Sequence, residues 1–306
     1  MRDAFAKEIK LLAEENDNVV LLSGDIGNRM FDGLKKSKPE QFINCGIAEA
    51  NMMSMAAGMA LSGMRPVIYT ITPFTTVRCL EQIKIGVAYH QAPVVIVGTG
   101  SGLSYSELGP THHSLEDMAI LRSIPNLNVL APVDKIELVH QLREAIVSPI
   151  PTYIRIGKKG EPNLLPNTAR SGIGKANIIK SGKKFLLLGV GPIIGEALNA
   201  AKLLKDNGID LCVASMGGIS PLDDKFLKKM ISENFINWIT LEEHGIIGGL
   251  GSSIIEWLSD SNNLSRVSLK RLGVPKMFIN KLGNQSYTRS QLGLDADGIF
   301  NTIINL

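Results

Sequence analysis

Short apolar runs that do not alternate with polar residues are the feature of this sequence that most restricts its fold. Such runs occupy residues 19–23, 42–44, 66–71, 93–98, 127–132 and 152–156, and helical patterns near 3–15, 48–62, 75–90, 115–121 and 134–147 separate them. Strands that are apolar on both faces are typical of a parallel sheet covered by helices on both sides. The pattern predicts an α/β fold with a doubly wound, mostly parallel sheet.

The same rhythm resumes in the second half of the chain. Strands are expected at residues 184–191, 210–216 and 237–243, and helices near 193–207, 223–232 and 249–259. Between the halves, residues 157–176 are rich in Gly, Pro, Asn and Lys and lack periodicity, which is typical of a connection between domains. We therefore expect two α/β domains, residues 1–165 and 166–306.

Composition narrows the class of partner and compartment. The 32 basic and 29 acidic side chains are interspersed along the chain, so nucleic acid is not an expected partner. No stretch reaches the length of a membrane span, and the three scattered cysteines, Cys45, Cys79 and Cys212, predict free thiols in the cytoplasm. A mean hydropathy of +0.12 favours association with another chain.

Several catalytic motifs are missing from the sequence. It has no HExxH, GxSxG or P-loop lysine, which argues against zinc hydrolases, serine hydrolases and NTPases. Two glycine-rich turns lack the rest of a nucleotide-binding fingerprint. We interpret residues 189–191 as a tight strand-to-helix turn and residues 248–251 as close helix packing.

Two polar features stand out. Glu49 is the one acid in an almost uncharged helical segment, where it either complements the helix dipole or lies in a dry interface, with a raised pKa, and shares a proton with a cofactor nitrogen. The loop of residues 99–113 follows an expected strand, at the edge of the sheet where ligands bind. Its His112 and His113 are either surface residues or hydrogen-bonded supports of the loop.

Together these segments resemble the thiamin diphosphate enzymes of the transketolase group. The resemblance is carried by GDIG (24–27), CGIAEANMMSMAAGMALSG (45–63), TPFTTVRCLEQI (72–83), GPTHHSLEDMAILRSIPNLNVLAP (109–132) and TLEEHGIIGGLGS (240–252). It covers the pyrimidine-binding and C-terminal domains of the family. The chain is similar to the C-terminal subunit of a split transketolase, which moves a two-carbon ketol unit between sugar phosphates.

The resemblance implies roles for individual residues. Glu49 matches the glutamate that hydrogen-bonds the aminopyrimidine of thiamin diphosphate and lets the cofactor act as its own base. The other implied cofactor contacts are Asp25, Phe74 and Arg78, and the implied substrate contacts are His112, Arg2, Arg155 and Lys158. His112 is implied to take part in catalysis as well.

Three departures from the family pattern concern the substrate and the cofactor ring. Leu108 stands where an Asp often reads a substrate hydroxyl, and Gly100 stands where a histidine binds phosphate. Val77 replaces a stacking aromatic, and the neighbouring Arg78 suggests a slip of one residue in the alignment.

The metal-binding half of the family is missing from the sequence. No GDG motif is present, and the Gly24, Asp25, Ile26 and Asn51 set belongs to the pyrimidine side, so we expect no metal ligands in this chain. The resemblance implies an N-terminal partner subunit that carries the GDG motif with its Asn and holds Mg²⁺ and the diphosphate, in an α2β2 assembly. The helix of residues 48–62 is then expected at a subunit interface.

Other functions stay open at this stage. The β subunit of a 2-oxo acid dehydrogenase shares the GIAE region, although the GPTH segment favours transketolase or a deoxyxylulose phosphate synthase. A scaffold subunit that kept the fold without the chemistry is a third alternative. The presence of both Glu49 and His112 argues against it.

Overall fold

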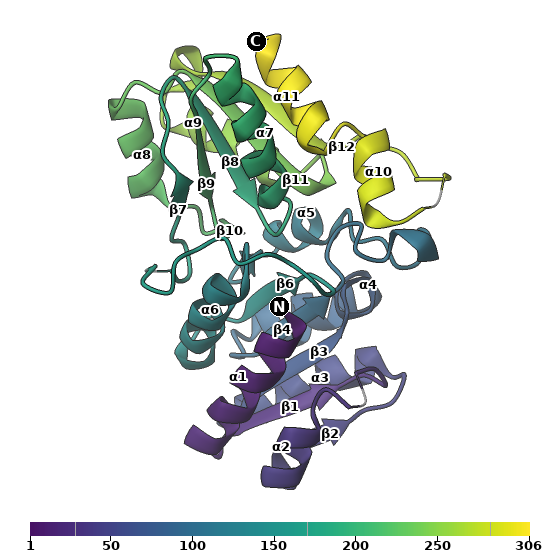
Figure 1. Cartoon of the computed structure of the whole chain (residues 1–306). Helices are drawn as coiled ribbons and strands as arrows, with labels where there is room; N and C mark the ends of the chain where they lie inside the picture. The colour runs from purple at the N-terminus through teal and green to yellow at the C-terminus, as the bar shows by residue number, and fades with distance from the viewer. Residues whose placement is uncertain (28, 170, 282) are drawn as a thin grey trace.

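In the computed structural model of the chain, described over residues 1–27, 29–169, 171–281 and 283–306, two sheets of seven and five strands form two stacked domains (Figure 1). The strand orders are β10-β5-β6-β4-β3-β1-β2 and β12-β11-β8-β9-β7. Among the described strands, only the pairs β10 with β5 and β7 with β9 are antiparallel. The prediction of two mostly parallel, helix-covered sheets is confirmed. Arg170, within the expected connection, lies outside the described residues.

The first domain holds the following elements. Its strands are β1 (Val19–Ser23), β2 (Phe42–Asn44), β3 (Arg65–Ile71), β4 (Val95–Thr99), β5 (Asn128–Leu130) and β6 (Thr152–Ile156). Its helices are α1 (Arg2–Glu15), α2 (Asp32–Ser37), α3 (Glu49–Leu61), α4 (Thr72–Thr75), α5 (Asp117–Arg122) and α6 (Lys135–Val147). Shorter turns are the 3₁₀ helices η1 (Pro39–Gln41), η2 (Val77–Cys79) and η4 (Ser106–Leu108), and η3 (Gln82–Tyr89) is a π-helix.

The second domain begins with β7 (Asn177–Lys180). Its other strands are β8 (Phe185–Val190), β9 (Leu211–Ser215), β10 (Gly218–Ser220), β11 (Asn237–Gly245) and β12 (Ser268–Val274). Its helices are α7 (Ile194–Asp206), α8 (Asp224–Ser232), α9 (Leu250–Asp260), α10 (Gln285–Gln291) and α11 (Ala296–Ile304), with the 3₁₀ turn η5 (Leu264–Arg266). In Figure 1, α10 lies at the edge of this domain that faces the first.

Apolar side chains on both faces of the strands explain the layers. In the first domain, one face packs against α1 and α6 through residues such as Phe5 and Leu138, and the other packs against α3 and η3 through residues such as Met52 and Ile83. The second face continues without a break into the second domain, where Trp238 belongs to the same buried cluster. The domains therefore share a core.

Strand β10 strengthens this connection. It leaves the second domain and pairs with β5 at the edge of the first sheet, with Gly218 opposite Leu130. A Cβ on Gly218 would lie 2.6 Å from the carbonyl oxygen of Val129, so only glycine fits at this position.

Both glycine-rich turns lead from a strand toward a helix. Gly191 adopts φ +75° at the turn from β8 toward α7. At the start of α9, the backbone N–H groups of Leu250 and Gly251 donate to the buried carboxylate of Glu242 over 2.7 and 2.9 Å. Burial raises the pKa of Glu242 to about 7. The N-terminus of α9 is thus occupied by the side chain of Glu242. A Cβ on Gly249 would collide with that side chain.

The expected helix at residues 75–90 is broken into α4, η2 and the π-helix η3. The hydroxyls of Thr75 and Thr76 both donate to the carbonyl of Thr72, and Thr76 leaves the helical region with φ −116° and ψ −85°. Short threonine side chains that bond to nearby carbonyls compete with helix continuation. Strands β7, β10 and β12 were not expected either.

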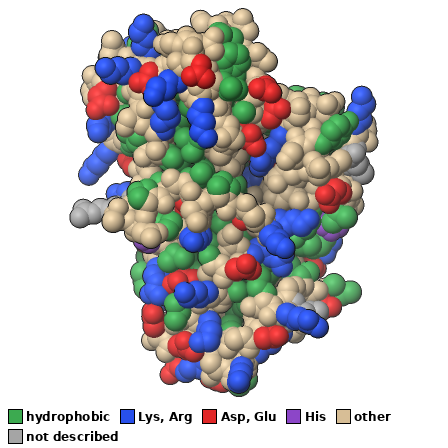
Figure 2. All heavy atoms as spheres, viewed as in Figure 1, with side chains coloured by type: hydrophobic (Ala, Val, Ile, Leu, Met, Phe, Trp, Pro, Cys, Tyr) green, Lys and Arg blue, Asp and Glu red, His purple; other side chains and the backbone are tan. Residues whose placement is uncertain are grey.

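The surface and the cysteines agree with the composition. Basic and acidic side chains are interspersed over the face drawn in Figure 2. Among the described residues, no helix has the length and apolar character needed to cross a membrane. Cys79 and Cys212 are buried free thiols in the shared core, and Cys45 is partly buried.

Candidate active site

Four segments of the first domain carry the predicted site residues to one edge of its sheet. Asp25 follows β1, Glu49 opens α3 beyond β2, Phe74 and Arg78 follow β3, and His112 lies in the loop beyond β4. These strands are neighbours and parallel, so their carboxyl ends meet at one edge, which is where open α/β sheets bind ligands.

Glu49 lies at the buried end of this edge. Its side chain is 4% exposed and accepts a hydrogen bond of 2.9 Å from Nη1 of Arg78. The guanidinium carbon of Arg78 lies 4.1 Å from the centre of the Phe74 ring, the distance of a cation–π contact. Glu49 is also in the first turn of α3, so it complements the helix dipole as well.

A row of aromatic rings continues from Phe74. The ring of His112 meets that of Phe74 edge-on at 5.4 Å, and the ring of Tyr105 lies 6.1 Å from His112. The ammonium of Lys158 lies 4.7 Å from the centre of the Tyr105 ring. The structure therefore brings Glu49, Arg78, Phe74, His112 and Lys158 into one continuous row, joined by Tyr105.

The two histidines of the loop differ in environment. Burial lowers the pKa of His112, helped by the charges of His113 and Arg78, which favours a neutral imidazole. Its Nδ1 lies 3.0 Å from the hydroxyl of Thr111. His113 is buried, and its Nε2 lies 3.0 Å from the carbonyl oxygen of Ser106, so it supports the loop from within.

Tyr105 is the residue of this row that sequence reasoning missed. Its ring packs so tightly against Gly100 that a Cβ there would lie 2.1 Å from a ring carbon. Gly100, the position where the family places a phosphate-binding histidine, is thus small because Tyr105 fills the space. An aromatic residue within a loop of small polar residues was the available signal.

Asp25 and Arg2 lie outside the row. Asp25 is exposed, accepts from the amide of Asn44 at 3.2 Å and donates its N–H to the carbonyl of Gly46 at 3.0 Å, which braces the turn before Glu49. Arg2 is the first residue of α1, and its buried Nε has no hydrogen-bond partner.

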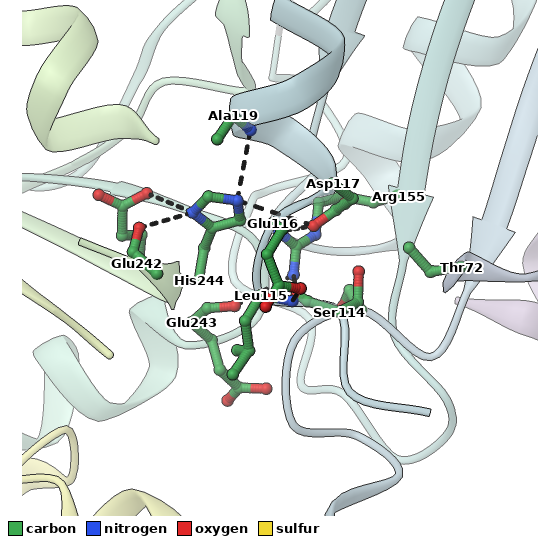
Figure 3. A network of polar contacts seen from close by, with 12 residues as sticks. Thr72, Ser114, Leu115, Glu116, Asp117, Ala119, Arg155, Glu242, Glu243 and His244 are labelled. Carbon is green, nitrogen blue, oxygen red and sulfur yellow. Dashed lines mark hydrogen bonds and ion pairs between the residues drawn. The ribbon is translucent and has the colours of Figure 1, made fainter. Parts of the chain in front are cut away.

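Arg155 lies behind the row, in a buried network between the domains (Figure 3). Its guanidinium donates to Asp117 at 3.2 Å and to the carbonyl oxygens of Ser114 and Glu243 at 3.4 and 3.1 Å. The side chain also borders a cavity of about 120 Å³ between the domains. The structure does not bring Arg155 together with the other predicted site residues.

The same network contains the histidine of the TLEEH segment. Burial lowers the pKa of His244 to about 4, and the ring Nδ1 lies 2.7 Å from the carbonyl oxygen of Gly245. Asp117 lies between this histidine and Tyr153, whose hydroxyl donates to the Asp117 carboxylate at 2.7 Å. These groups connect the domains.

The fold and this edge of the sheet define a class of protein that direct comparison identifies. The transketolase pyrimidine-binding domain model matches residues 1–161, and the transketolase C-terminal domain model matches residues 174–299. The chain belongs to the transketolase family, whose enzymes depend on thiamin diphosphate.

Individual relatives narrow the assignment. One of the subunits of the apulose-4-phosphate transketolase of Phocaeicola vulgatus is 32% identical over 305 residues, which are 99% of this chain and 96% of that protein. A solved structure described as a split gene transketolase, inactive β4 tetramer, matches with a TM-score of 0.88 and 30% identity over 99% of this chain and 96% of that one. The 1-deoxy-D-xylulose-5-phosphate synthase of Synechocystis sp. is 35% identical over 281 residues, which are 90% of this chain but only 43% of that protein.

Coverage decides between these relatives. The chain spans nearly the whole of the split-transketolase subunits and less than half of the synthase. The chain therefore resembles the subunits of split transketolases from end to end, and these relatives support transketolase function in the C-terminal role.

Proposed function

We propose that Glu49 and Phe74 form the part of the thiamin diphosphate site that receives the aminopyrimidine ring, and that Arg78 occupies this position until the ring binds. His112, with Tyr105 and Lys158, then faces the sugar phosphate. The observation that carries this proposal is the continuous row of contacts from the buried carboxylate of Glu49 to the ammonium of Lys158.

The contacts of Arg78 support the fit of these residues to the ring. A guanidinium is flat and carries N–H donors, and here it stacks on Phe74 and donates to Glu49. An aminopyrimidine is also flat and offers polar groups at its edge, so it needs the same pair of partners, an aromatic face and a buried carboxyl group. We infer that the ring takes the position that the guanidinium now holds.

Within this proposal Glu49 acts on a proton. When bound, the cofactor supplies the carbon that accepts and releases the two-carbon ketol unit. Glu49 holds a proton at the ring nitrogen, and its burial keeps competing water away from that contact. Asp25 has a lesser role, because it braces the turn that precedes Glu49.

The substrate side combines a neutral imidazole with cations. His112 provides hydrogen bonds to a sugar hydroxyl or carbonyl group, and Lys158 and Arg2 provide positive charge for the phosphate. Because Tyr105 fills the space beside Gly100, phosphate recognition relies on these cations. Arg155 donates its hydrogen bonds within the protein, so we assign it to the support of this side.

We further propose that the N-terminal partner supplies the GDG motif with its Asn and holds Mg²⁺, in an α2β2 assembly. Among the described residues, no group of three or more His, Cys, Asp and Glu side chains is suited to a metal ion. Apolar side chains on α3 and η3 face solvent, and we call them the α3–η3 surface: Met55, Leu61, Ile85 and Tyr89. A helix that is apolar on all sides needs a second covering layer, so this surface is where we place the partner.

The division of the chain at residue 165 remains a proposal. It is supported by the gap between the two family matches, which runs from residue 162 to 173.

The test is ketol transfer from xylulose 5-phosphate to ribose 5-phosphate with thiamin diphosphate and Mg²⁺. The chain is assayed alone and after mixing with a candidate N-terminal subunit. We expect activity only in the mixture. Activity of the chain alone would contradict the two-subunit proposal, and a stable cofactor-bound complex without activity would point to a different ketol donor or to a 2-oxo acid.

A further inference from the structure

The loop that carries His112 has two different sides. Tyr105 and His112 face the row of site residues, whereas Leu103 and Leu115 are buried in the apolar cluster of the second domain, with residues of β8, β11 and α7. A loop of the first domain therefore has its apolar anchors in the second.

Polar contacts fix the same loop to the second domain at two points. The backbone N–H of Leu103 donates to Oε1 of Glu243 at 2.6 Å, and the hydroxyls of Ser106 and Thr288 lie 2.6 Å apart in a buried position. The approach at the first point is so close that a Cβ on Gly102 would lie 2.5 Å from the carbonyl oxygen of Glu243.

Glu243 and Thr288 are the residues of the second domain that make these two contacts, and further hydrogen bonds hold both of them in place. The carboxylate of Glu243, on β11, also accepts from Gln285 at 2.8 Å and from Arg289, both on α10. Thr288 belongs to the same helix, is 1% exposed and donates to the carbonyl of Asn284 at 3.2 Å. Strand β11 and helix α10 thus form one support for the loop.

Hydrogen bonds within the loop connect the segment around His112 to the residues that contact the second domain. The N–H of Ser114 donates to the carbonyl of Gly102 at 2.9 Å, and His113 Nε2 lies 3.0 Å from the carbonyl of Ser106. His113 and Ser114, which follow His112, are therefore bonded to the two parts of the loop that contact the second domain.

We propose that the second domain serves the reaction by positioning the His112 loop, with Glu243 and Thr288 as its positioning residues. This inference rests on the substrate role proposed for His112. Neither residue contacts Glu49, Phe74 or Arg78, so loss of an anchor should disturb the substrate and leave the cofactor in place.

The matched variants are Thr288→Val, which removes only the hydroxyl, and Thr288→Ser, which keeps it. In the full chain we expect Thr288→Val to speed hydrogen exchange of backbone amides in residues 101–114, and Thr288→Ser to restore slow exchange. In the enzyme assembled with its N-terminal subunit, Thr288→Val should raise the KM for the sugar phosphate about five-fold, the effect of one lost hydrogen bond, with unchanged affinity for thiamin diphosphate.

Two further variants keep the test decisive. Ser106→Ala removes the same hydrogen bond from the loop side, and it should act no more strongly in combination with Thr288→Val than alone. Glu256→Gln is the control, because Glu256 pairs with Arg122 between the domains without contact to residues 101–114, and it should change neither exchange nor KM.

The outcomes separate this inference from the proposed function. Unchanged exchange in Thr288→Val and Ser106→Ala, or an equal loss of cofactor affinity, would overturn the positioning role. Faster exchange with an unaltered KM would also overturn it as a contribution to the reaction. Absence of ketol transfer in the unmodified assembly would count against the proposed function, while the exchange measurement would still decide whether the second domain holds the loop.

Discussion

Arg78 donates a hydrogen bond of 2.9 Å to Glu49, so a half-exposed cation neutralises a buried acid at the sheet edge. The side chain of Arg78 is 48% exposed, and its second contact is the ring of Phe74. A group that enters between Phe74 and Glu49 therefore has to displace a side chain that the protein already supplies.

Replacement of this side chain tests the displacement. We expect Arg78→Ala, in the chain assembled with its N-terminal subunit, to bind thiamin diphosphate about five-fold more tightly, because a partly exposed ion pair and a cation–π contact together cost about 1 kcal/mol to break. Calorimetric titration measures the Kd, with Lys36→Ala on α2 as a control. Weaker binding by Arg78→Ala would mean that Arg78 holds the cofactor instead of giving way to it.

The proposed role of Glu49 requires a carboxyl group and not only a hydrogen-bond acceptor. Glu49→Gln keeps the size of the side chain, so we expect a native circular dichroism spectrum and a loss of kcat of at least about 100-fold. The exposed Glu40→Gln serves as the control and should retain full activity. Near-normal turnover by Glu49→Gln would remove this residue from the mechanism.

His112 is predicted to act on the substrate. Its lowered pKa favours a neutral ring at pH 7, which both donates and accepts hydrogen bonds. His112→Ala should raise the KM for the sugar phosphate about ten-fold and leave the Kd of thiamin diphosphate unchanged. Steady-state kinetics and cofactor titration give the two values, and His140→Ala on α6 is the comparison. A large loss of cofactor binding would reassign His112 to the cofactor.

The α3–η3 surface predicts where the partner binds. Ile85 is 50% exposed on η3, and an aspartate there would place a charge in an apolar contact, so Ile85→Asp should fold normally and fail to form the two-subunit complex. Size-exclusion chromatography with light scattering measures assembly. Leu203→Asp on α7 makes the same kind of change on the second domain and should assemble normally, whereas normal assembly of Ile85→Asp would place the interface elsewhere.

Glu137 predicts how stability depends on pH. This fully buried carboxyl joins α6 to β9 through the hydroxyl of Ser215 at 2.9 Å, and burial raises its pKa from 4.5 to about 7. Between those values the folded chain holds a proton that the unfolded chain loses, so the stabilisation is complete below pH 4.5 and is lost as the pH rises through 7.

The comparison with Glu137→Gln isolates this contribution, because the amide does not titrate. Between pH 4.5 and 8 the free energy of unfolding of the unmodified chain should fall by about 3 kcal/mol relative to the variant. Urea unfolding at both pH values measures the difference. Parallel pH profiles for the two proteins would show that Glu137 is ionised in the folded chain.

The sequence predicted the central strands because burial on both faces leaves a local signal. Strand β1 is a short, mostly apolar run and β6 is a short run that is buried throughout, and both were placed at their observed bounds. Strand β10 has no such signal, since it consists of Gly218, Ile219 and Ser220 and exists because β5 of the other domain pairs with it. Contacts between distant segments are not encoded in a local pattern.

The site divides in the same way. Glu49, Phe74 and His112 belong to motifs that can be read locally, and the structure brings them into one row. Tyr105 and Glu243 were missed because their importance comes from tertiary contacts, to Gly100 in one case and to Leu103 in the other. Arg155 matched a motif position, but its hydrogen bonds are made inside the protein.

The core shared by the two domains has a consequence for dissecting the enzyme. A fragment that ends at residue 165 would expose the apolar side chains that now meet the second domain, among them Met118, and would lose the strand that covers β5. Heat or denaturant should therefore melt both domains in one cooperative step. The two domains thus form one folding unit, and neither domain alone can replace the whole chain in studies of its chemistry.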